Sequence, residues 1–60
     1  MGIDYKILRE TTELSVEEFA RELDVSPELV LNWETGAAVP DAMKQKKIFA
    51  LVKKIAERGQ

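Results

Sequence analysis

The chain has 60 residues and a net charge of −2, and it contains no cysteine and no histidine. These absences exclude disulfides, thiolate or imidazole catalysis and the usual zinc ligands, so we expect no enzyme, no metal, no cofactor and no small-molecule substrate. No apolar run approaches the ~18 residues of a membrane span and no secretory signal precedes the first expected helix, so we expect a cytoplasmic protein without a membrane partner. A chain this short buries only about 60% of its unfolded surface, which makes its core small and its stability marginal.

The first expected helix spans residues 4–11. Asp4 lies near its positive end, where a carboxylate is favourable. Ile3, Ile7 and Leu8 mark the side that we expect to be buried. The polar residues 10–13 complete this helix and form the expected connection to the next one.

The second expected helix spans residues 16–23, and the residues around its start predict where it begins. Ser15 and Glu18 have the spacing of a capping box, in which the serine hydroxyl accepts a bond from the Glu18 amide while the carboxylate accepts one from the Ser15 amide. Apolar residues then recur at helical spacing, at positions 16, 19, 20 and 23. One face of this helix is therefore expected to be buried.

The third expected helix spans residues 27–35. Ser26 is its expected cap, and Pro27 stands at the first helical position, where a missing N–H costs nothing. Gly36 ends it. The connection from the second helix is too short for anything except an abrupt turn, in which Asp24 is expected near the left-handed region that aspartate tolerates.

After an extended linker that ends at Pro40, the last expected helix spans residues 41–58. Its apolar residues cover an arc of roughly 160° when each residue advances by 100°. The other helices can cover only one side of it, so we expect part of the arc to form a two-fold interface in a homodimer. The expected interface residues are Ile48, Phe49, Val52, Ile55 and Ala56. The alternative is that a bent or tilted helix buries the whole arc within one chain.

Together these elements predict an all-α fold of four helices that forms one domain over residues 1–60. All four helices contribute to the expected core, which consists of Ile7, Leu8, Phe19, Ala20, Leu23, Val30, Trp33, Ile48, Leu51, Val52 and Ile55. Trp33 is expected to be mostly buried, because it is large and is placed where three helices should meet.

Two short capped helices joined by a tight turn match the description of a helix-turn-helix. The stretch resembles the phage-repressor family, the Xre/Cro-like or lambda-repressor-like helix-turn-helix proteins. The residues that carry the resemblance are Leu14, Ser15, Glu18, Phe19, Ala20, Leu23, Val25, Ser26, Val30, Trp33, Glu34, Gly36 and Pro40. The resemblance also implies that Arg9 forms an ion pair with Glu34 and so joins the first helix to the third.

The resemblance implies a transcriptional regulator of the repressor or antitoxin type that reads double-stranded operator DNA with its third helix. The base-reading positions of the family correspond here to Pro27, Glu28 and Asn32, and a glutamine position on the second helix corresponds to Val16. Of these, Asn32 can bond adenine at two points. The full set expected to face DNA is Val16, Glu17, Pro27, Glu28, Leu31, Asn32 and Thr35.

The charge distribution favours a second interpretation. Residues 1–34 contain nine acids and three bases, giving −6, whereas residues 35–60 contain two acids and six bases, giving +4. Glu17, Glu18 and Glu28 would face or flank the phosphate backbone and repel it, since affinity for DNA comes from lysine and arginine. The alternative function is therefore a protein-interaction or oligomerisation module on the same scaffold, with an acidic face that binds DNA weakly or not at all.

Overall fold

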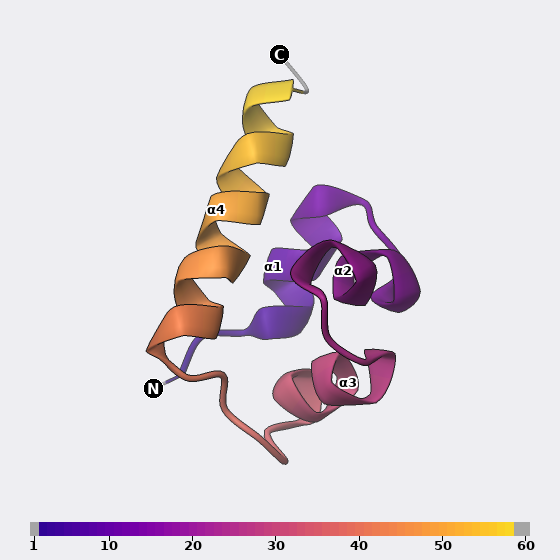
Figure 1. The fold of residues 1–60 in the computed structure, drawn as a ribbon, viewed down its shortest axis with the longest axis vertical. Helices are drawn as coiled ribbons and strands as arrows, with labels where there is room; N and C mark the ends of the chain where they lie inside the picture. The colour runs from indigo at the N-terminus through magenta and orange to yellow at the C-terminus, as the bar shows by residue number, and fades with distance from the viewer. Residues whose placement is uncertain (1, 59–60) are drawn as a thin grey trace.

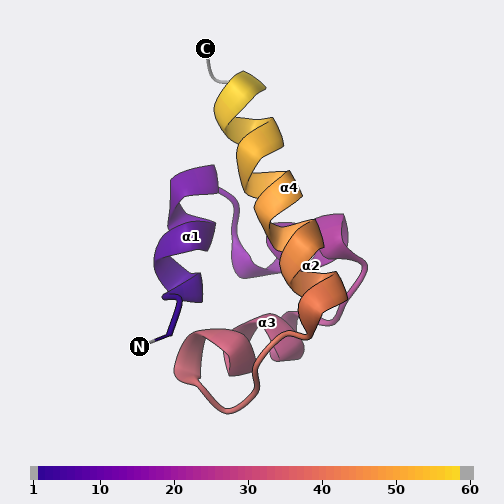
Figure 2. The same cartoon turned by 90° about the vertical axis from the view of Figure 1, so that its left-hand side faces the viewer.

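The computed structural model describes residues 2–58, which form four α-helices: α1 (Tyr5–Thr12), α2 (Val16–Leu23), α3 (Pro27–Thr35) and α4 (Ala42–Arg58). The predicted all-α fold is thus confirmed. α4 lies along one side of the molecule, and the three shorter helices all lie on the same side of α4 (Figure 1). Both views place α3 at one end of the longest axis and the last turns of α4 at the other end (Figures 1 and 2). Across residues 2–58, no helix has the length and apolar character needed to cross a membrane.

Each helix begins directly after a polar side chain that accepts a hydrogen bond from an amide of the first turn. The four caps are Asp4, Ser15, Ser26 and Asp41, with donor–acceptor distances between 2.8 and 3.2 Å. The predicted capping box is complete, because the Ser15 amide also donates to Glu18 Oε1 at 2.9 Å. Since the two aspartates cap their helices from outside, α1 and α4 each begin one residue later than predicted.

The first three helices end at residues with a left-handed backbone, which are Glu13, Asp24 and Gly36, with φ of 62°, 59° and 86°. The conformation predicted for Asp24 is confirmed. Its amide donates to the Arg21 carbonyl at 3.2 Å, and the Val25 amide donates to the Ala20 carbonyl at 3.0 Å. This pair of bonds is a Schellman motif, which satisfies the last carbonyls of α2 and turns the chain sharply into α3.

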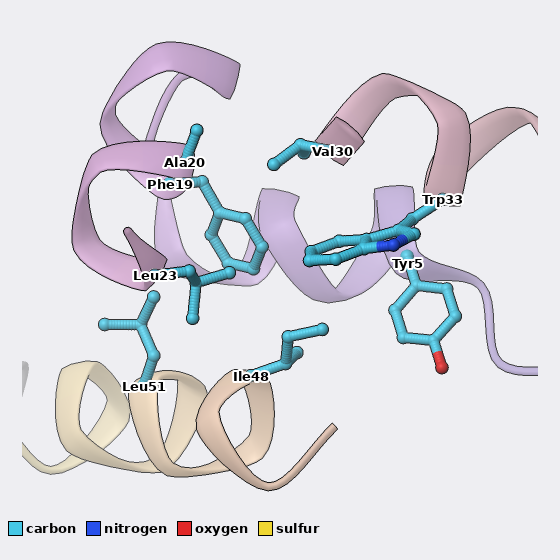
Figure 3. Close-up of a cluster of buried hydrophobic side chains, with 8 residues drawn as sticks. All are labelled: Tyr5, Phe19, Ala20, Leu23, Val30, Trp33, Ile48 and Leu51. Carbon is cyan, nitrogen blue, oxygen red and sulfur yellow. The ribbon is translucent and has the colours of Figure 1, made fainter. Parts of the chain in front are cut away.

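The core lies where all four helices meet (Figure 3). Its buried side chains are Tyr5, Phe19, Ala20, Leu23, Val30, Trp33, Ile48 and Leu51. Trp33 is only 4% exposed, as predicted, and its ring centroid lies 6.5 Å from that of Tyr5. The predicted core residues Leu8, Val52 and Ile55 are half-buried and pack against this cluster.

The buried side of α1 is the predicted one for Leu8 but not for Ile3 and Ile7. Ile7 is 56% exposed, and Ile3 is exposed as well. The core side of α1 instead carries Tyr5, Leu8 and Thr12, which follow one another at spacings of three and four residues and so share a face. Ile7 lies on the opposite face, since it is 200° from Tyr5 at about 100° per residue.

Thr12 was expected in a polar connection, but it is a buried residue at the end of α1. Its hydroxyl donates to the Arg9 carbonyl at 2.5 Å and accepts from the Leu14 amide at 3.2 Å. Both of these bonds hold the backbone where α1 turns towards α2. A buried hydroxyl with its donor and acceptor both used costs the fold little.

Replacing Trp33 tests the core. Because Trp33 contributes the largest side chain of the buried cluster, Trp33→Ala should lower the free energy of unfolding by ~3–5 kcal/mol. That loss is comparable to the whole stability expected of a domain this small, so the variant should be largely unfolded. Chemical denaturation followed by circular dichroism measures the effect. A wild-type tryptophan fluorescence maximum typical of free solvent would contradict the burial of Trp33.

Candidate functional site

The outer side of α3 carries most of the residues that were expected to face DNA. Val30 and Trp33 turn inwards to the core, so the side opposite them faces solvent. The exposed residues on or near this side are Pro27, Glu28, Leu31 and Thr35. These four predicted site residues therefore lie on one accessible helix face.

Asn32 is less accessible than the sequence predicted. It was expected to point outwards, yet it is half-buried. Its carbonyl accepts a bond from the Ala38 amide at 3.1 Å, because the linker after Gly36 folds back along the end of α3. The Thr35 hydroxyl also donates to this carbonyl, at 3.3 Å. These bonds use the backbone of Asn32 and not its side-chain amide.

The start of α2 supplies the remaining predicted site residues. Glu17 is exposed, whereas Val16 is half-buried and packs against the core. Only part of Val16 is therefore available to a ligand, in agreement with its expected place on the apolar face of α2. The exposed Glu18 carboxylate accepts a hydrogen bond from the Ser15 amide in the capping box. This bond, together with the interaction with the Ser15 hydroxyl, holds the pKa of Glu18 below its usual value.

Negative charge dominates this region. Glu17, Glu18 and Glu28 are exposed on the first turns of α2 and α3. A carboxylate near a helix N-terminus is stabilised by the helix dipole, and each one also partly cancels the positive potential that would attract a phosphate there. The arrangement therefore presents hydrogen-bonding groups on a face that repels polyanions.

The predicted ion pair between Arg9 and Glu34 is confirmed, and it joins α1 to the last turn of α3. Arg9 Nε donates to Glu34 Oε2 at 2.6 Å and Nη2 donates to Oε1 at 3.4 Å. The two side chains are 15% and 7% exposed. The hydrogen bond to Glu34 raises the pKa of Arg9, although burial acts in the opposite direction.

A third partner of this pair was not predicted. Arg9 Nη1 donates to the Leu14 carbonyl at 3.0 Å, so one guanidinium joins α1, the α1–α2 connection and α3. A hydrogen bond to a backbone carbonyl cannot be predicted from the sequence, because every residue has a carbonyl. The sequence signal for this packing was that Thr12 and Tyr5 are two helical turns apart and so share one face of α1.

The predicted dimer residues on α4 separate into different environments. Ile48 is completely buried inside the chain, so it cannot belong to an interface between chains. Val52 and Ile55 are half-buried against the core, while Phe49 and Ala56 are exposed. The tilt of α4 against α1 and α2 therefore covers the middle of the apolar arc and leaves its margin open.

The part of the chain that the structure describes contains no group of acidic side chains arranged to hold a metal ion. The Ser15 and Ser26 hydroxyls both accept capping bonds. The exposed side chains of α3 can form hydrogen bonds and apolar contacts. No protein-family model, curated protein or solved structure matches this chain.

A double-mutant cycle measures how far the ion pair fixes α3. Both side chains are largely buried, so Arg9→Met or Glu34→Met alone leaves the charge of the other residue unpaired. Each single variant should therefore lose ~3–5 kcal/mol of stability. The double variant should recover much of that loss, since it removes both charges and fills similar volume. Urea denaturation of the four proteins gives the coupling energy. Additive losses would show that the two residues do not act as a pair.

The capping box predicts a specific dependence of stability on pH. Because the pKa of Glu18 is lowered on folding, its contribution is complete above the ordinary glutamate pKa and is lost as the pH falls through the lowered one. Glu18→Gln keeps an acceptor but does not titrate. The stability difference between wild type and this variant should therefore shrink on acidification. A difference that stays constant with pH would contradict the assigned role of Glu18.

Proposed function

We propose that this protein is a sequence-specific DNA-binding transcriptional regulator of the repressor or antitoxin type, acting in the cytoplasm on a lambda-repressor-like helix-turn-helix. In this proposal α2 and α3 are the motif, and α3 enters the major groove of double-stranded DNA. The observation that carries it is the uncovered outer side of α3, on a helix whose inner side is fixed by Val30 and Trp33.

Three side chains of α3 have a chemically matched role at a base edge. The Asn32 amide suits the paired donor and acceptor of adenine, and Leu31 suits a thymine methyl group. Glu28 can only accept, which suits the amino group of cytosine. The amides of Val16, Glu17 and Glu28 in the first turns of α2 and α3 have no partners within their helices and would position phosphates.

The fixed orientation of α3 also supports the proposal. A helix that reads bases must keep its angle to the rest of the domain, since a small misplacement removes several contacts together. The Arg9–Glu34 pair ties the end of α3 to α1, and the Schellman turn ties its beginning to α2. Little rearrangement would therefore be needed for binding.

A second candidate is an interaction module, and the exposed acidic residues around α3 favour it. Lysine and arginine supply most of the affinity for DNA, and the linker residues Ala37, Ala38 and Val39 provide neither. In this alternative, the exposed Leu31 with its acidic surroundings would dock on a basic protein surface.

The deciding experiment is a mobility-shift titration against mixed genomic DNA at low and at physiological salt. Retention that weakens with salt is expected for a DNA regulator, because phosphate contacts release counterions. No retention even at low salt would remove the DNA proposal and leave the interaction module. A preferred site for later measurements can then be selected from a random-sequence library.

Two substitutions on α3 connect binding to this face. Asn32→Ala should lose ~1–3 kcal/mol on the preferred site and little on random sequence, because it removes base contacts only. Glu28→Gln should strengthen binding to random DNA by relieving repulsion. Glu57→Gln on α4 removes the same charge elsewhere and serves as the matched control. Equal effects of the two glutamine variants would show that the α3 face does not meet DNA.

A further inference from the structure

The solvent side of α4 carries a concentration of positive charge. Six of the nine lysines and arginines of the chain lie in α4, and four of these are exposed lysines on the side away from the core: Lys46, Lys47, Lys53 and Lys54. At about 100° per residue, these four lie between about 100° and 160° from the fully buried Ile48. Arg9–Glu34 is the one ion pair within residues 2–58, so none of the four lysines is neutralised by a carboxylate there.

The four lysines form two rows along the helix. Lys46 and Lys53 form one row, and Lys47 and Lys54 form the other. Within a row the residues are separated by two turns, which is ~10.5 Å along the axis, and the two rows lie about 100° apart around it. The solvent side of α4 is therefore positively charged on both of its flanks.

The strip between the lysine rows is uncharged over most of its length. Met43, which is 73% exposed, and the exposed Ala50 lie on the helix between the rows. Glu57, one turn beyond Lys53, lies in the same strip and ends the basic stretch. Residues 43–54 thus present a neutral centre between two basic flanks.

α4 forms a ridge on the surface of the molecule. The three shorter helices all lie on one side of it, and in the view from the side of α4 this helix passes in front of α2 (Figures 1 and 2). Its 17 residues make it ~25 Å long. The outer side of α4 can therefore approach a large partner ahead of the other helices.

We propose that the outer side of α4 docks in the major groove of B-form DNA without reading its sequence, with one lysine row against the phosphates of each wall. A helix with its side chains is about 10–12 Å across and the groove is about 12 Å wide, so the walls lie at the flanks of an inserted helix. Both flanks of α4 are then complementary in charge to the phosphates that they meet. Met43 and Ala50 face the base edges, where they make apolar contacts but no hydrogen bonds.

The positions of the lysine rows favour B-form DNA over other polyanions. A flat anionic membrane would first meet the uncharged strip, and the apolar face of α4 that could insert into lipid is used in the core. Duplex RNA has a deep and narrow major groove, which does not admit a helix. Only the wide groove brings phosphates to both flanks at once.

This inference goes beyond the proposed function and does not depend on it. α3 lies at one end of the longest axis, whereas α4 runs along the side of the molecule, with its lysine rows turned away from the core (Figure 1). DNA held by the lysine rows therefore needs no contact with α3. Either surface can be removed by substitution while the other is kept.

Fluorescence anisotropy with a labelled random-sequence DNA duplex, at salt concentrations from about 50 to 200 mM, is the first test. Four phosphate contacts predict that log K falls with log salt with a slope of about −3.6, which is roughly a hundredfold loss of affinity over this range. The quadruple variant Lys46→Gln/Lys47→Gln/Lys53→Gln/Lys54→Gln should lose this dependence and bind at least about tenfold more weakly at the lower salt. No binding by the wild type, or a quadruple variant with the wild-type slope, would overturn the proposal.

The two rows can be tested one at a time. Lys46→Gln/Lys53→Gln and Lys47→Gln/Lys54→Gln should each make the slope shallower by about 1.8, because each removes two phosphate contacts. The control Lys6→Gln/Arg21→Gln removes two charges at exposed positions on α1 and α2 and should change the slope little. Equal effects of the control and the row variants would show that net charge alone matters and would overturn the proposal. All of these positions are exposed, so circular dichroism should show that the variants remain folded.

Comparison of ligands tests the groove itself. A duplex RNA of the same length should bind at least about tenfold more weakly than the DNA duplex, because its major groove is too narrow for α4. Vesicles that contain phosphatidylserine should not compete with DNA for the wild-type protein. Equal affinity for the RNA duplex, or displacement of DNA by the vesicles, would overturn the major groove as the ligand.

Substitutions on α3 separate this inference from the proposed function. In the background of the quadruple variant, Glu28→Gln and its control Glu57→Gln report on α3 without a contribution from the lysine rows. If random-sequence binding is lost in the quadruple variant and does not respond to Asn32→Ala or Glu28→Gln, the inference holds and α3 is removed from the proposed function. Binding that persists in the quadruple variant and responds to the α3 substitutions would overturn the inference and leave the proposed function intact.

Discussion

The packing of α1, α2 and α3 centres on one largely buried side chain, the Arg9 guanidinium, which is 15% exposed. Arg9 holds the Glu34 carboxylate of α3 and the Leu14 carbonyl before α2, so three segments that are separate in the sequence share a single point of attachment. A buried ion pair adds little net stability over a well-packed apolar pair, because both charges lose water. Its geometry is demanding, however, and a partner displaced by an ångström leaves a buried charge unpaired. Arg9 therefore restricts how α1 and α3 can pack more than it strengthens their packing.

Most of the backbone could be predicted because the signals are local. A cap, a proline at the first helical position and a residue that tolerates the left-handed region each act within about one turn, so Ser15, Ser26 and Asp24 could be assigned from their neighbours alone. The inner face of α3 was predictable for the same reason, since Val30 and Trp33 repeat at helical spacing. Local and tertiary preferences agree in this stretch.

The face of α1 could not be predicted from apolar spacing, because its core side includes polar atoms. Thr12 is buried with both hydroxyl bonds made by backbone groups of its own turn, and Tyr5 keeps its hydroxyl near the Gln45 amide, at 3.4 Å from Nε2. A prediction based on hydropathy alone places the Ile7 side chain in the core and the Thr12 side chain in solvent. The bond from the Ala38 amide to the Asn32 carbonyl was likewise not predictable from helical spacing, since it depends on how the linker returns along α3.

One charge pattern connects the two ends of the molecule. The acids are concentrated in α1–α3 and their connections and most of the bases in α4, so folding brings opposite charges together, and long-range attraction favours the docking of α4. Glu17, Glu18 and Glu28, which are exposed on the first turns of α2 and α3, would weaken a contact with phosphate. At the other end, acidic residues of α2 and of the α1–α2 connection line one hollow together with basic residues of α4. The same segregation of charge therefore gathers acids on the first turns of α2 and α3 and places acids near bases at the end of α4.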